Sequence, residues 1–133
     1  MKYMLLMQFS GQSVDFAPID QWTPEEVGAH IGFMKDTNRG LVGSGELVDA
    51  QGLAMPDTAK IVRSHANGTP LVTEGPFAET KEFLAGWWIV DCETPERALE
   101  IAAQVSAAPG PKGEPLNMPI EVRQVMSVPP TEL

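Results

Sequence analysis

An α+β fold in a single domain is predicted by the order of the strand-like and helical segments and by the size of the chain. These segments follow one another as strand, helix, strand, hairpin, strand, helix and strand. Two strand–helix–strand halves with an antiparallel centre make a ferredoxin-like sandwich, here with an inserted β-hairpin. The chain has 133 residues, 43% of them hydrophobic, so residues 1–133 suit one compact domain with its own core.

The first helix has a clear start signal. Thr23 can cap it, Pro24 suits its first position, and Glu26 completes a capping box. Gly40 is expected to end this helix. Its apolar face is expected at three positions with helical spacing, namely Val27, Ile31 and Met34.

The second helix is expected to open at Thr94-Pro95-Glu96. Its buried stripe is expected at Ala98, Ile101, Ala102 and Val105. Residues 107–119, which follow, are rich in proline and glycine, and we expect them to form a loop.

Extended segments complete the pattern. Apolar runs predict strands at residues 3–9, 41–53, 83–90 and 120–126, of which 41–53 contains glycines and should be bent or bulged. Asn67-Gly68 lies between two further extended runs, 59–64 and 71–73, and is a hairpin signal.

One face of the predicted sheet needs a partner, because two helices can cover only the other face. Trp87 and Trp88 should lie on opposite faces of their strand. One of these tryptophans, together with Phe83, would give the open face its apolar area. A homodimer packed sheet to sheet is therefore expected.

The composition disfavours several classes of function. A formal net charge of −9 makes nucleic acid or an anionic membrane a poor direct partner. Cys92 is the single cysteine, which excludes an intrachain disulfide and suits a reducing compartment, and the apolar run 1–9 is too short for a membrane span. We expect a cytoplasmic protein. Two histidines far apart and the lack of a glycine-rich phosphate loop predict neither a metal nor a cofactor.

His30 is the leading candidate for acid–base chemistry. It borders the predicted apolar helix face, where a histidine either acts as a general base toward a pocket or lies hydrogen-bonded in a core. Glu46 and Glu74 are the carboxylates that could orient it. The ordinary interpretation of Glu46 is an exposed strand residue, and that of Glu74 is a turn residue before Gly75-Pro76.

Further ligand contacts are expected around the turn that follows Glu74. Phe77 is either a packing anchor or a ligand contact. Glu79 and Lys81 stand two apart and share a face, as a solvated ion pair or as ligand contacts. Arg63 could bind a ligand carboxylate or pair across the sheet.

The string Gly75-Pro76-Phe77-Ala78-Glu79-Thr80-Lys81-Glu82 resembles the YCII-related (DGPF-domain) family. Weaker matches extend over nearly the whole chain, at Lys2-Tyr3-Met4-Leu5-Leu6, Ala29-His30, Phe33-Met34, Gly45-Glu46-Leu47, Ala98-Leu99-Glu100 and Ile120-Glu121-Val122-Arg123. Two positions depart from the family's pattern. Glu74 replaces the aspartate that usually leads the motif, and Gln124 stands where proline is often found.

The resemblance implies a dimeric α/β barrel of two ferredoxin-like sandwiches, with a small organic ligand between sheet and helices. Some relatives are small lyase-type enzymes acting on hydroxylated or chlorinated aromatics, with a histidine–carboxylate pair as the proposed acid and base. Others resemble partners encoded beside extracytoplasmic-function sigma factors. Three alternatives follow: a cofactor-independent lyase or isomerase with His30 as base, a non-catalytic regulatory or binding module, and a dimeric domain with a vestigial pocket.

Overall fold

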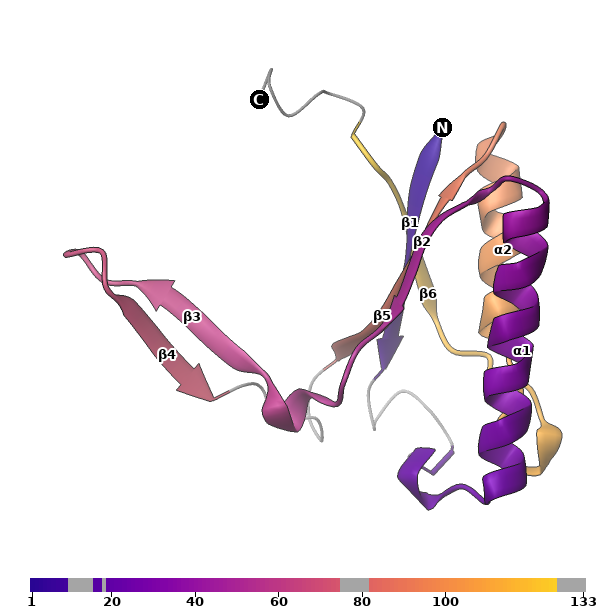
Figure 1. Ribbon diagram of the computed structural model, residues 1–133, viewed down its shortest axis with the longest axis horizontal. Coiled ribbons are helices and arrows are strands. Elements are labelled where there is room, and N and C mark those ends of the chain that lie inside the picture. The colour runs from indigo at the N-terminus through magenta and orange to yellow at the C-terminus, as the bar shows by residue number, and fades with distance from the viewer. Residues whose placement is uncertain (10–15, 18, 75–81, 127–133) are drawn as a thin grey trace.

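A computed structural model describes residues 1–9, 16–17, 19–74 and 82–126. Its main sheet has four strands in the order β2-β5-β1-β6, with every neighbouring pair antiparallel. Both helices cover the same face of this sheet (Figure 1). With the hairpin set aside, the topology is that of a ferredoxin-like sandwich, so the predicted α+β class is confirmed for the single chain.

The elements in chain order are β1 (Lys2–Phe9), the short 3-10 turn η1 (Ile19–Gln21), α1 (Pro24–Gly43), β2 (Leu47–Gly52), η2 (Pro56–Thr58), β3 (Lys60–Ser64), β4 (Pro70–Glu74), β5 (Phe83–Asp91), α2 (Pro95–Ser106), η3 (Pro111–Gly113) and β6 (Ile120–Gln124).

The hydrophobic core lies between the main sheet and the two helices. Its fully buried members are Leu5 on β1, Val90 on β5, and Ile101 and Val105 on α2. Each such side chain stabilises the fold by roughly 1.5–3 kcal/mol relative to an exposed position. The predicted stripe of α2 is confirmed, because all four of its expected residues are buried.

The predicted start of α1 is confirmed, but its predicted end is wrong. Thr23 Oγ1 accepts from the Glu26 amide at 3.2 Å, and Glu26 Oε1 accepts from the Thr23 amide at 2.9 Å. The helix passes through Gly40 and ends at Gly43, and Gly45, two residues later, has a φ of +79°. There the amides of Gly45 and Glu46 bond back to carbonyls of the last turn, which is a Schellman motif. The helix therefore stops beside the glycine that adopts a positive φ, and not at the first glycine of the segment.

The buried face of α1 also differs from the prediction. Ile31 is 45% exposed, while Thr37 and Leu41 are buried and Met34 packs against the core. The side of α1 that faces the sheet consists of His30, Met34, Thr37 and Leu41. A histidine and a threonine interrupt the apolar character of that series, so hydrophobic periodicity identified Met34 correctly but wrongly included the exposed Ile31.

The predicted strand over residues 41–53 is correct only in its second half. Residues 41–43 complete α1, and β2 begins at Leu47. A register shift between Leu47 and Asp49 confirms the expected bulge.

The hairpin signal at Asn67-Gly68 is confirmed by β3 and β4, which pair with Val62 opposite Val72. This ribbon projects away from the helix-covered sheet (Figure 1). Every residue of both strands is exposed, including Val62 at 59%.

The two tryptophans of β5 point to opposite faces, as predicted. Trp88 is buried on the helix side, and Trp87 lies on the open face, where its indole Nε1 donates to Asp49 Oδ2 at 3.3 Å. The expectation for Phe83 is wrong. A bulge between β1 and β5 shifts the alternation of side chains, so Phe83 points to the same side of the sheet as Phe9. That side is the one covered by the helices, and the two ring centroids lie 5.2 Å apart. Strand alternation places Met4, Leu6, Leu84 and Ile89 on the open face together with Trp87.

Candidate functional site

His30 lies in the second turn of α1, facing the loop between α2 and β6. Its Nδ1 is 3.0 Å from the carbonyl oxygen of Pro109. The indole of Trp22 meets the imidazole edge to face, with centroids 5.5 Å apart. The loop itself is held to the start of α1, because Glu26 Oε2 accepts from the Lys112 amide at 2.7 Å. The imidazole is therefore fixed by a backbone acceptor and an aromatic ring.

This contact assigns the two ring nitrogens different roles. A carbonyl oxygen can only accept a hydrogen bond, so the proton of the neutral ring must lie on Nδ1 of His30. Nε2 then carries the lone pair and is the nitrogen that remains for a ligand. A histidine held in this tautomer can take up a proton at Nε2 without losing its bond to Pro109.

A pocket of about 260 Å³ lies between α1 and the edge of the sheet formed by β2 and β5. Its lining residues are Met7, His30, Met34, Asn38, Ala50, Gln51, Gly52, Ala85, Gly86, Trp87 and Trp88. On α1 the contributing residues are His30, Met34 and Asn38, spaced four apart on one face of the helix. This pocket is the candidate site, because it combines an apolar lining with a few polar groups and a fixed histidine.

Gly86 allows the two strands to approach closely beside this pocket. A Cβ atom at this position would lie 2.7 Å from the carbonyl oxygen of Gln51, which is a backbone atom and cannot turn away. Glycine is therefore required here by the proximity of β2. Its missing side chain also leaves room at the pocket wall.

Glu46, expected to orient His30, binds elsewhere. Its carboxylate accepts from Arg97 Nε at 2.9 Å, from Arg97 Nη2 at 3.0 Å, and from Ser44 Oγ at 2.7 Å. The hydrogen bonds from Arg97 and Ser44 hold the pKa of Glu46 below its usual range. The hydrogen bonds that Arg97 donates to Glu46 and to Glu100 raise the pKa of its guanidinium. These contacts join the end of α1 to the start of α2.

Glu74 also lies apart from His30. It ends β4, and its Oε2 accepts from Lys60 Nζ at 2.7 Å across the hairpin. Arg63 lies on β3, in the same exposed ribbon. Within the described ranges, the expected contact of His30 with Glu46 or Glu74 is therefore absent. Of the remaining predicted site residues, Phe77, Glu79 and Lys81 lie outside the part of the chain that the structure describes.

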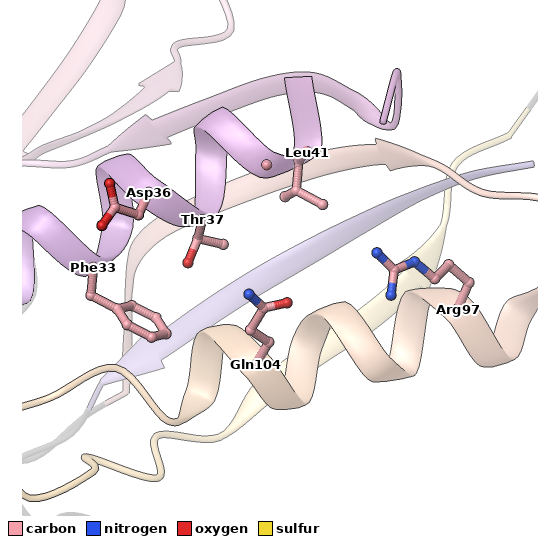
Figure 2. Close-up of a pocket in the computed structure, with 7 residues that line it drawn as sticks. Phe33, Asp36, Thr37, Leu41, Arg97 and Gln104 are labelled. Carbon is pink, nitrogen blue, oxygen red and sulfur yellow. The ribbon is translucent and has the colours of Figure 1, made fainter. Parts of the chain in front are cut away.

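A second pocket, of about 330 Å³, lies between the two helices (Figure 2). Arg97 and Gln104 of α2 face Phe33, Thr37 and Leu41 of α1. The charge of Arg97 is already balanced by Glu46 and by Glu100, whose Oε2 lies 3.1 Å from Nη1. We regard this pocket as a crevice between helices rather than as an anion site.

Other candidate chemistry finds little support in the described residues. No group of three histidine, cysteine, aspartate or glutamate side chains gathers there as a metal site would require. Cys92 is buried, and burial raises the pKa of its thiol, which suits a packing role rather than a nucleophile. Neither α1 nor α2, within those same ranges, has the length and hydropathy of a transmembrane helix.

Fold and site together define a small ferredoxin-like α+β protein with a histidine-lined pocket beside the sheet edge. Comparison with known proteins identifies the family to which the chain belongs. The YCII-related domain model matches residues 1–110, and the chain belongs to that family. An uncharacterized protein of Rhizobium meliloti (strain 1021) is 34% identical over 112 residues, which cover 84% of this chain and 86% of the relative.

The sequence pointed to His30 but missed the residues that surround it. Asn38 and Trp22 lie in or beside the site, and Pro109 supplies the carbonyl that holds the imidazole. Asn38 could have been found from its spacing, since it follows His30 by eight residues and Met34 by four. Pro109 could not, because a backbone acceptor 79 residues away leaves no mark in side-chain chemistry.

Proposed function

We propose that this protein binds a small organic molecule and transfers a proton through His30, in lyase- or isomerase-type chemistry that needs no cofactor. The observation that carries the proposal is the contact of His30 Nδ1 with the Pro109 carbonyl beside an apolar pocket. It supports a fixed Nε2 base, and proton transfer by such a group contributes roughly 10²–10⁴-fold to a rate.

The proposed step is a simple proton relay. Nε2 of His30 removes a proton from a C–H or O–H group of the ligand, and the imidazolium keeps its Nδ1 bond to Pro109. The electron pair left on the ligand shifts along the molecule. In an isomerase the proton returns to another ligand atom, and in a lyase it goes to the departing group. The Pro109 carbonyl takes the orienting role that a carboxylate was expected to have.

The test compares wild-type protein with His30→Ala and His65→Ala. His65 is exposed at the hairpin turn, so its loss provides a matched control. Each protein is screened by thermal shift against phenols, hydroquinones, lactones and small carboxylic acids, since a ligand that binds only the folded state raises the melting temperature. We expect a shift that persists in His65→Ala and disappears in His30→Ala.

Deuterium uptake then tests the chemistry. A compound that binds should exchange an acidic C–H for deuterium in D₂O with the wild type and with His65→Ala, but not with His30→Ala. Equal exchange in all three proteins would remove His30 from the mechanism. A panel without any thermal shift would favour a protein partner instead.

We further propose a homodimer in the cytoplasm, with two open sheet faces packed against each other as in a dimeric α/β barrel. The support is the apolar open face around Leu6 and Trp87, which neither α1 nor α2 covers. Trp87→Glu should lower the mass measured by light scattering from that of a dimer to that of a monomer. A monomeric wild type, or a variant that remains dimeric, would exclude this interface.

The exposed β3–β4 ribbon favours a second candidate, a regulatory or binding module that acts with a protein such as an extracytoplasmic-function sigma factor. Val62 and Val72 form an apolar pair on this ribbon, and a two-stranded hairpin is marginally stable without further packing. Co-purification of a co-expressed sigma factor with the wild type, but not with Val62→Asp, would support this function. If Val62→Asp instead disrupts the homodimer, the ribbon belongs to the dimer.

A further inference from the structure

Asn38 is held in one orientation by Trp88. The indole Nε1 of Trp88 donates to Asn38 Oδ1 at 2.9 Å, and Trp88 is buried in the core. An indole N–H can only donate, so it must face the amide oxygen. The NH₂ group of Asn38 is therefore the part left for the pocket that this residue lines.

His30 presents the opposite hydrogen-bonding character from the same helix. Its Nδ1 is committed to the Pro109 carbonyl, which leaves Nε2 as an acceptor. Eight residues separate His30 from Asn38, which is about 12 Å along a helix axis. Met34 lies between them on the same face and lines the pocket as well. The pocket thus has an acceptor at one end, a donor at the other, and an apolar stretch between.

We propose that Asn38 determines ligand specificity, by donating through its Trp88-oriented amide to an acceptor atom of the ligand. The ligand class is an apolar molecule with a carbonyl-type oxygen at the Asn38 end and an acidic proton at the His30 end. This inference rests on the proposed function for the role of His30, while the role of Asn38 is new.

The size of the pocket and the charge of its lining define the ligand class more narrowly. A pocket of about 260 Å³ is smaller than the range of about 300–1,000 Å³ that drug-sized ligands occupy, so a single ring fits best. The lining residues in the described ranges include no lysine or arginine. A neutral carbonyl oxygen therefore suits Asn38 better than a carboxylate, which would require a cationic partner when desolvated.

The experiment measures binding of four probes by isothermal titration calorimetry. 4-Hydroxyacetophenone has both the hydroxyl and the carbonyl, acetophenone lacks the hydroxyl, and 4-ethylphenol lacks the carbonyl while keeping the shape. Tyramine replaces the carbonyl with a cationic amine. Wild-type protein should bind 4-hydroxyacetophenone about tenfold more tightly than 4-ethylphenol, because only the former satisfies the Asn38 amide. Equal binding of these two probes, or binding of neither, would overturn the proposal.

Asn38→Asp is the decisive variant, because it keeps the shape and reverses the hydrogen-bonding character. One carboxylate oxygen can still accept from Trp88, and the other presents an acceptor to the pocket. We expect the affinity for 4-hydroxyacetophenone to fall about tenfold and that for tyramine to rise. A gain in tyramine binding cannot result from misfolding.

Gln51→Glu adds the same charge on β2, at a residue that lines the pocket but whose side chain donates to Asp49 Oδ1 at 3.1 Å, and serves as the control. A reversal in Gln51→Glu equal to that in Asn38→Asp would show a general charge effect and overturn the role of Asn38. An unchanged probe order in Asn38→Asp, with binding still lost in His30→Ala, would refute this inference alone. A reversal in Asn38→Asp with no effect of His30→Ala would support Asn38 and refute the proposed function of His30.

Discussion

Arg97 holds both carboxylate oxygens of Glu46, with Nε 2.9 Å from Oε2 and Nη2 3.0 Å from Oε1. Glu46 follows the turn that ends α1, and Arg97 lies in the first turn of α2. The side chain of Glu46 is only 16% exposed, so this pair is better shielded than a surface ion pair. It joins two helices that are distant in the sequence.

Arg97→Lys should lower the free energy of unfolding by about 1 kcal/mol, because a lysine cannot form the two parallel bonds that the guanidinium makes with Glu46. Urea denaturation measures the change. The control is Arg39→Lys, since Arg39 pairs with Asp36 on the exposed side of α1 and should contribute almost nothing. Equal effects at the two positions would contradict the structural role of the Arg97 pair.

The stability of the protein should fall in acid partly through Glu46. Hydrogen bonds from Arg97 and Ser44 lower the pKa of Glu46 in the folded state from its ordinary value of 4.5. Just below that value the unfolded state holds more protons, so stability rises with pH in this window. The contribution is complete above about 4.5 and disappears as the pH falls through the lowered pKa of the folded state.

Glu46→Gln should therefore flatten the dependence of the unfolding free energy on pH below that value, as urea titrations at several pH values would reveal. Asp57→Asn, at an exposed position, is the control. A slope that is unchanged in Glu46→Gln would show that this carboxylate is not linked to folding.

Ile101→Ala and Leu99→Ala should lower the free energy of unfolding by very different amounts, although both residues lie on α2. Ile101 is fully buried, and its truncation leaves a cavity that typically costs about 2–5 kcal/mol. Leu99 is 57% exposed, so its replacement should change the free energy of unfolding by less than about 0.5 kcal/mol. Thermal or urea unfolding of both variants tests the assigned face of the helix, and similar losses would mean that the face is wrong.

Gly86→Ala should destabilise the sheet beside the candidate pocket. The added Cβ would come within 2.7 Å of the Gln51 carbonyl, so β2 must shift away from β5. We expect faster amide hydrogen exchange on β2 and weaker binding of any pocket ligand. Gly28→Ala, on an open stretch of α1 with no atom within 4 Å of the new Cβ, should instead be tolerated. Unchanged exchange in Gly86→Ala would refute the close approach.

Glu26→Gln should separate two roles of one side chain. Oε1 of Glu26 completes the capping box with Thr23, while Oε2 accepts from the Lys112 amide in the loop that holds Pro109. Glutamine has one acceptor oxygen and can keep only one of these bonds. The Lys112 amide should lose protection against hydrogen exchange while α1 stays helical by circular dichroism. Full protection of Lys112 would show that the loop is held by other contacts.

Local signals predicted the elements well wherever a short segment determines its own structure. The capping box at Thr23 and Glu26 placed the start of α1, and Asn67-Gly68 placed the hairpin. These signals work because their hydrogen bonds lie within a few residues. The end of α1 was misplaced, because several glycines follow one another there and only Gly45 takes the left-handed conformation.

The candidate site was predictable only in part. His30 was identified from its residue type and its place near a helix face, but its contact partner was expected to be a carboxylate. Glu46 and Glu74 are instead bound by Arg97 and Lys60, whose positions depend on how α2 and the hairpin pack. The residue types along the sequence cannot show which oppositely charged side chains will form ion pairs in the folded protein.

By itself, the sequence determined the class of fold, the order of its elements, the stripe of α2 that faces the core, and one titratable residue suited to a pocket. Only the tertiary structure decided that α1 presents His30, Met34 and Asn38 to the sheet, that the Pro109 carbonyl selects the tautomer of His30, and that Trp88 orients Asn38. The physical reason is the separation in sequence between the residues that interact. Capping and periodicity act over a few residues, whereas these contacts join residues 50 or more positions apart, and they form only after the helices have packed on the sheet.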